Sequence, residues 1–94
     1  MKSSIIGKIA DKMLENLGFK KVVDSEFFVS YERWNEQFKY LQKLDIIDKE
    51  SKPSIIMSYD PELCDQKNIG STCVGLTSDE AVAAAMKLRS KGWK

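Results

Sequence analysis

The chain has 94 residues, of which 43% are hydrophobic and 31% are charged, and its formal net charge is +1. This composition excludes a disordered chain, and no apolar run is long enough to span a membrane as a helix. Because the net charge is close to zero, the chain has no global field that would attract nucleic acid. The N-terminus lacks the apolar core of a signal peptide, so we expect a single cytoplasmic domain over residues 1–94.

A helix over residues 4–17 is the first predicted element. Ser3 or Ser4 is the expected N-terminal cap, and Gly18 can take the left-handed conformation that ends many helices. One apolar stripe, with spacings of three and four residues, is expected to face the core. The stripe consists of Ile6, Ile9, Ala10, Met13 and Leu17, widened by Ile5 and Leu14.

From residue 19 the apolar period changes to two, which predicts strands over 19–24, 27–34, 37–48 and 53–59. A turn at Asn35-Glu36 places Tyr31 opposite Tyr40, and a four-residue turn after residue 48 places Ile46 opposite Ile55. Both predicted registers put the same apolar residues on one face. These residues are Phe27, Tyr31, Leu44, Ile46 and Met57.

The C-terminal helix is predicted from signals at both of its ends. Thr77 is a suitable N-cap and Glu80 follows three residues later, which is the spacing of a capping box, while Gly92 can close the helix. Val82, Ala85, Met86 and Trp93 are expected to cover the sheet. With a short fifth strand over 72–76, the predicted fold is α+β, an antiparallel β-meander of four to five strands with an N-terminal and a C-terminal helix packed on one face.

No pattern in the chain predicts catalysis, a metal site or a cofactor site. The chain contains no histidine, and Cys64 and Cys73 are too far apart for a Cys-x-x-Cys pair, so we expect two reduced thiols. Asp60, Glu62 and Asp65 lack the glycine and the terminal glutamate of a calcium loop. No glycine pattern of a phosphate-binding loop precedes a helix. We therefore expect a protein that is not an enzyme and needs no cofactor.

The sheet face turned away from the helices is the predicted interaction surface. It carries large apolar side chains among charged ones, which is typical of a surface that binds a partner. Alternatively, the C-terminal segment or the loop after Asp60 covers this face. The predicted partner-binding residues are Phe28, Trp34, Lys39, Leu41, Lys43 and Ile47.

A nucleic-acid-binding module is the alternative function for the same face. Trp34 or Tyr40 would then be a stacking platform, although acidic residues alternate with the basic ones. The basic residues on or beside the face would be Lys20, Lys21, Arg33, Lys39 and Lys43. Homodimerisation through an exposed strand edge is compatible with either function.

Three segments resemble small proteins encoded by phages and prophages of Gram-positive bacteria, most of which have no known function. The segments are Leu17-Gly18-Phe19-Lys20-Lys21, Tyr31-Glu32, and Leu76-Thr77-Ser78-Asp79-Glu80-Ala81 leading to Lys91-Gly92-Trp93. The resemblance implies an accessory protein that acts inside the bacterial cell, and it carries no catalytic residues. Our hypothesis is therefore binding to a bacterial host or defence protein, as inhibitors of CRISPR nucleases do.

Overall fold

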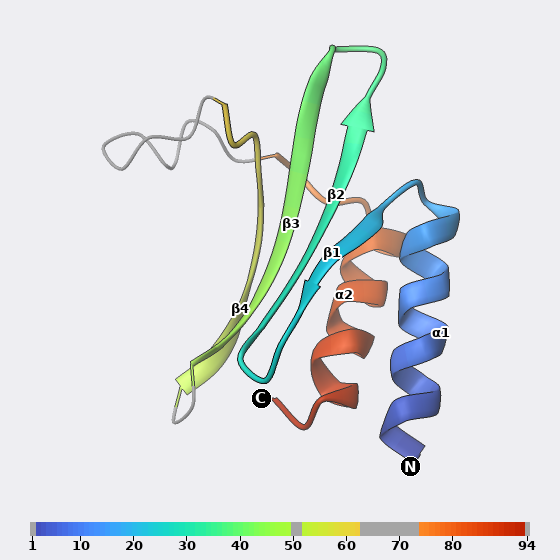
Figure 1. The fold of residues 1–94 in the computed structure, drawn as a ribbon, viewed down its shortest axis with the longest axis vertical. Coiled ribbons are helices and arrows are strands. Elements are labelled where there is room, and N and C mark those ends of the chain that lie inside the picture. The colour runs from blue at the N-terminus through green and yellow to red at the C-terminus, as the bar shows by residue number, and fades with distance from the viewer. Residues whose placement is uncertain (1, 50–51, 63–73, 94) are drawn as a thin grey trace.

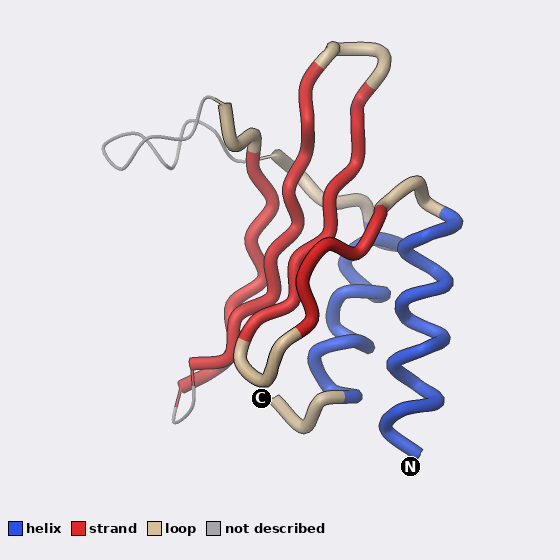
Figure 2. Tube along the Cα trace, in the orientation of Figure 1, coloured by secondary structure: helices blue, strands red, loops and turns tan. Residues whose placement is uncertain are grey.

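The computed structural model describes residues 2–49, 52–62 and 74–93. Four antiparallel strands form a sheet in the order β1-β2-β3-β4, and the two helices lie side by side on one of its faces (Figures 1 and 2). The predicted α+β meander is confirmed. Its elements are α1 (Lys2–Asn16), β1 (Lys20–Asp24), β2 (Phe28–Asn35), β3 (Tyr40–Lys49), β4 (Lys52–Tyr59) and α2 (Ser78–Ser90).

The hydrophobic core lies between the helices and the central strands. It is formed by alternate residues of β2 and β3 together with one side of each helix, because successive side chains of a strand point to opposite faces. Met13, Leu17, Ile56, Leu76 and Trp93 pack around its margin. The buried members are Leu14, Phe19, Val29, Tyr31, Leu44, Ile46, Ala83, Ala84 and Leu88.

The helix ends largely follow the sequence signals. Thr77 and Glu80 form the complete capping box of α2. Gly18 has a φ of +97°, and the amide of Phe19 donates to the Leu14 carbonyl at 2.9 Å, which closes α1 as expected. The start of α1 differs from the prediction, because the helix begins at Lys2, before both serines that were suggested as caps.

The β2–β3 turn is longer than predicted. The strands end at Asn35 and resume at Tyr40, with Lys39 in the left-handed region at a φ of 57°. The Asn35 side chain accepts from the Phe38 amide at 2.9 Å, which organises the loop. Tyr31 consequently pairs with Leu44 instead of Tyr40. Because this shift is an even number of residues, each strand keeps the face that the sequence predicted.

The predicted register of β4 is wrong by one residue. Ile46 lies opposite Ile56, where the prediction placed Ile55. The pair next to the turn, Lys49 with Lys52, follows the predicted register. Between this pair and the pair of Ile47 with Ile55, a bulge in β4 shifts the register by one residue. A one-residue shift turns all side chains of a strand over, so Ile56 packs on the core and Met57 lies on the opposite face.

The buried side of α2 also differs from the predicted stripe. Val82 is 53% exposed, whereas Glu80 and Lys87 are buried together with Ala83, Ala84 and Leu88. Two of these five buried positions carry charge, so hydrophobic periodicity could not locate this face. The two charged side chains are buried because each has an ion-pair partner on the sheet or on α1.

The first half of α1 is more exposed than its sequence indicates. Ala10 and Leu14 are fully buried, but Ile5, Ile6 and Ile9 are 62%, 41% and 48% exposed. The predicted stripe is therefore correct only for its C-terminal half. The fifth strand expected over 72–76 begins outside the described residues. Cys64, Asp65 and Cys73 also lie outside them. Within the described part, the Val74 amide donates to the Ser58 carbonyl at 2.9 Å.

Candidate functional site

Five of the six predicted partner-binding residues lie together on the sheet face away from the helices. Phe28 is directly opposite Ile47, and Trp34 is directly opposite Leu41. Lys43 lies between these two pairs on β3. Lys39 is the exception, because it belongs to the β2–β3 turn and not to the strand. We refer to this side as the helix-free face, since neither α1 nor α2 packs on it (Figure 1).

The end of the β2–β3 hairpin projects beyond the helices (Figure 1). Trp34 is 53% exposed there and Phe38 is 69% exposed. The Trp34 indole N–H donates to the Glu36 carboxylate at 2.6 Å, and Glu36 also accepts from Lys39. The bonds from Lys39 and Trp34 lower the pKa of Glu36. The only polar atom of the Trp34 side chain is thus already bonded, which leaves the ring as an oriented apolar surface.

Two charged side chains of the helix-free face, Lys43 and Asp45, have partners on the same face. Lys43 lies 3.8 Å from the Glu32 carboxylate. Asp45 is only 5% exposed and accepts 2.6 Å hydrogen bonds from the hydroxyls of Ser30 and Tyr59. These polar groups are therefore satisfied within the face, beside its apolar side chains.

The bulge in β4 adds apolar residues to this face that sequence reasoning missed. Met57 lies opposite Asp45, and Ile55 lies opposite Ile47 and is 38% exposed. No sequence signal marks the bulge, because Ile55, Ile56 and Met57 are apolar at consecutive positions and any of them could face the core. Only the pairing with β3 shows which of these side chains face the core.

A partly buried arginine network lies on the opposite side, where α2 begins. Arg33 forms a 2.8 Å ion pair with Glu80 and donates to Gln42 Oε1 at 2.6 Å and to the Leu17 carbonyl at 2.9 Å. Its guanidinium also lies 4.3 Å from the centre of the Phe19 ring. One side chain therefore joins β2 and β3 to the end of α1 and the start of α2.

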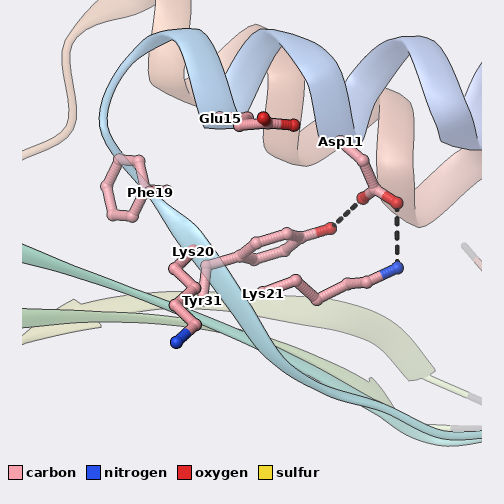
Figure 3. Close-up of a pocket in the computed structure, with 6 residues that line it drawn as sticks. All are labelled: Asp11, Glu15, Phe19, Lys20, Lys21 and Tyr31. Carbon is pink, nitrogen blue, oxygen red and sulfur yellow. Dashed lines mark hydrogen bonds and ion pairs between the residues drawn. The ribbon is translucent and has the colours of Figure 1, made fainter.

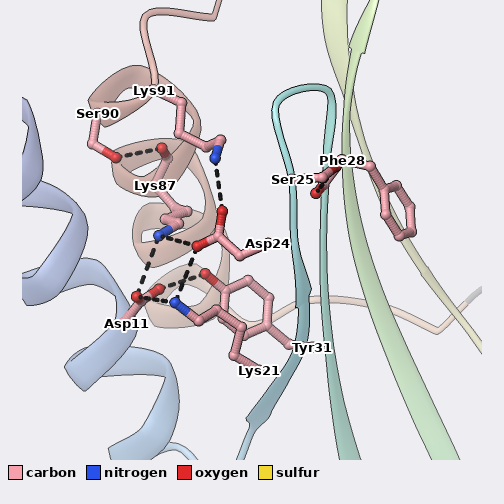
Figure 4. A network of polar contacts seen from close by, with 9 residues as sticks. All are labelled: Asp11, Lys21, Asp24, Ser25, Phe28, Tyr31, Lys87, Ser90 and Lys91. Carbon is pink, nitrogen blue, oxygen red and sulfur yellow. Dashed lines mark hydrogen bonds and ion pairs between the residues drawn. The ribbon is translucent and has the colours of Figure 1, made fainter.

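A second polar network lies where α2 ends, and we call it the lysine–aspartate cluster. It joins α1, β1, β2 and α2 (Figure 4). Lys87, with only 8% of its side chain exposed, lies 3.2 Å from Asp11 and 3.1 Å from Asp24. The cluster consists of Asp11, Lys21, Asp24, Tyr31, Lys87 and Lys91.

The two carboxylates of this cluster are held in their ionised form. Burial alone would raise the pKa of Asp11, but bonds from Tyr31, Lys21 and Lys87 outweigh burial and lower it. Burial likewise opposes the shift at Asp24, where bonds from three lysines lower the pKa strongly. Burial and the bond to Asp11 raise the pKa of Tyr31, so this hydroxyl stays protonated at neutral pH.

Next to the cluster, α1 and β1 border a hollow of about 430 Å³ (Figure 3). Its walls include Glu15, Phe19 and Lys20, and at one side the Tyr31 hydroxyl donates to Asp11 at 2.6 Å. Since Asp11 is ionised and Tyr31 is protonated near neutrality, this pair is poorly matched to proton transfer at that pH. Sequence reasoning missed both networks, because their members lie far apart along the chain.

Comparisons with protein families, with curated proteins and with solved structures found no match for this chain. Within the described ranges, no helix is both long enough and apolar enough to cross a membrane.

Acid is expected to destabilise the fold through the lysine–aspartate cluster. Asp11 and Asp24 have pKa values lower than in the unfolded chain, so their contribution is complete above an unfolded pKa of about 4 and is lost as pH falls through the folded values. Urea unfolding across a pH series should show this loss. The Asp24→Asn variant should be less stable at pH 7 and should lose less of its stability in acid. An equally steep acid limb in that variant would contradict this assignment.

Proposed function

We propose that this chain is a protein-binding module that contacts its partner through the helix-free face and the projecting end of the β2–β3 hairpin. The observation that carries the proposal is the exposure of Trp34 and Phe38, both more than half exposed on the same hairpin. Aromatic residues dominate the energetics of protein interfaces. Following the phage-type resemblance, we propose a bacterial host or defence protein as the partner and inhibition as the mode of action.

The geometry of the hairpin supports binding through a fixed surface. The Glu36 carboxylate bonds both the Trp34 indole and the Lys39 ammonium, which favours one orientation of the Trp34 ring. Leu41 lies directly beside Trp34 on the neighbouring strand and extends the apolar area. A surface that is ordered before binding loses less side-chain entropy when the partner docks.

Nucleic-acid binding, the alternative function, finds less support in the arrangement of the basic residues. Lys21 and Arg33 point toward the helices, where they pair with carboxylates. Lys39 and Lys43 each have a glutamate partner. Neutralised lysines release few counterions from a phosphate backbone. Binding of single- and double-stranded oligonucleotides across a salt series separates the two functions, since a steep salt dependence would favour the alternative.

Replacing both Trp34 and Leu41 with serine tests the proposed surface. We expect affinity for a partner captured from bacterial lysate to fall by about thirtyfold or more, because truncating an interface hot spot removes about 2 kcal/mol of binding free energy. The free energy of unfolding should change little, since neither side chain belongs to the buried core. Biolayer interferometry and urea unfolding measure the two quantities.

The exposed isoleucines of α1 provide the matched control. The double variant Ile5→Ser, Ile9→Ser also removes two exposed apolar side chains, but these lie on α1 and not on the helix-free face. This variant should keep its affinity for the partner. If it loses binding while the Trp34 and Leu41 variant retains it, the interface lies on α1 and the proposed site is wrong.

A further inference from the structure

A second hollow, of about 330 Å³, opens between the start of α1 and the end of α2. Four lysines line its wall, namely Lys8, Lys21, Lys87 and Lys91, and Asp11 is the one carboxylate that lines it in the part of the chain that the structure describes. We propose that this hollow binds a phosphoryl group. The site lies on the helix side of the sheet and does not depend on the function proposed for the helix-free face.

The charges around the hollow do not balance. Among the described residues, the four ammonium groups of the lining lysines face the carboxylates of Asp11 and Asp24, which leaves an excess of two positive charges. Lys8 has no ion-pair partner among the described residues. A second negative group in the hollow would therefore complete the charge pairing, and a phosphoryl group carries up to two negative charges.

Hydrogen-bond donors also remain available after the cluster has formed. An ammonium group has three N–H donors. Lys21 uses one on Asp11 and one on Asp24, and Lys87 does the same, so each has one left. Together with the ammonium of Lys8, these donors suit the several acceptor oxygens of a phosphoryl group better than a halide ion.

Gly7 keeps the back of the hollow open. A Cβ at this position would lie 3.0 Å from Ser90 Oγ and 3.8 Å from Lys87 Nζ. Glycine is unfavourable inside a helix, so a specific reason is needed for its presence one turn into α1. Here it allows α1 to approach α2 closely and leaves space in front of the Lys87 ammonium.

Because the lysines already bond to two carboxylates, affinity for the phosphoryl group should be modest. We expect a dissociation constant on the order of millimolar. The group could be free inorganic phosphate or the terminal phosphate of a nucleotide, since both present the same oxygens. The hollow is open to solvent, so a phosphate ester can enter with the rest of its molecule outside.

Titration of the full chain with inorganic phosphate, followed by amide chemical shifts in NMR at constant ionic strength, tests the proposal. We expect saturable shifts at Gly7, Ser90 and Lys91 and none at the Trp34 indole. A parallel titration with adenosine monophosphate distinguishes the sources. Equal shifts at these residues show that the hollow accepts a phosphate ester as well as the free ion, and shifts with inorganic phosphate alone assign it to the free ion.

Lys8→Gln is the informative variant, because Lys8 has no described role in the ion-pair cluster and its loss should leave the fold intact. It should weaken phosphate binding about threefold, as expected for removing one solvent-exposed charge contact. Lys12→Gln makes the same charge change one turn along α1, outside the hollow, and should have a smaller effect. Absence of saturable shifts in the wild-type chain, or equal effects of the two variants, would overturn the proposal.

Discussion

Replacing Arg33 with methionine is expected to lower the free energy of unfolding by about 3 kcal/mol, the lower end of the loss that is typical for one partner of a buried ion pair, because Arg33 is 23% exposed and Glu80 is 4% exposed. The substitution would remove the Arg33 donors from three acceptors: the Glu80 carboxylate, which among the described residues would keep only its bond from the Thr77 amide, the oxygen of the fully buried Gln42 amide, and the Leu17 carbonyl. Methionine fills a similar volume, so the loss should come mainly from the hydrogen bonds that these acceptors lose.

Arg33→Lys is the matched control for this prediction. Lysine keeps the positive charge but lacks the planar fork that bonds Glu80, Gln42 and Leu17 at the same time. It should therefore recover less than half of the stability lost in the methionine variant. Urea unfolding followed by circular dichroism measures both values. If Arg33→Lys were as stable as the wild-type chain, charge alone would account for the role of this residue.

The second large effect is expected for Lys87→Met, at about 2 to 3 kcal/mol of unfolding free energy at pH 7. This estimate is lower than for a fully buried pair, because the side chains of Asp11 and Asp24 are about one quarter exposed to solvent. Without Lys87, the two carboxylates lose the ammonium that lies between them (Figure 4). Lys21 would remain as their shared partner.

The pH dependence of this variant provides an independent check. An ion pair contributes only while the carboxylates are ionised, so the difference between wild type and Lys87→Met should shrink as pH falls below about 4. Lys12→Met, on the exposed side of α1, should change stability by less than about 0.5 kcal/mol. A difference that stays constant down to low pH would indicate loss of packing rather than loss of the ion pairs.

The two networks have a common consequence for the proposed interaction surface. Each ties the helices to the sheet at one end of α2, one through Glu80 and the other through Lys87. The strands that carry the helix-free face are therefore held to the helices near both ends of α2. Binding residues on a sheet that is held to the helices in this way keep their relative positions better than residues on isolated loops.

The elements could be predicted because their signals are local. The capping box at Thr77 and Glu80, the closing glycine at Gly18 and the change of period after residue 19 depend only on residues close together in the chain. The same holds for the outward orientation of Trp34 and Leu41, because the even shift in the β2–β3 pairing preserved the faces.

Tertiary structure alone decided which charged residues are buried and which apolar residues are not. Glu80 and Lys87 are buried because Arg33, Asp11 and Asp24 reach them from other elements, and no local pattern records such distant partners. The bulge that turned Met57 outward likewise depends on pairing with β3. By itself, the sequence determined the order of the elements and the face that carries Trp34. The polar networks, the lysine-lined hollow and the register of β4 arise only when distant segments meet, because ion pairs and strand pairing act through space rather than along the chain.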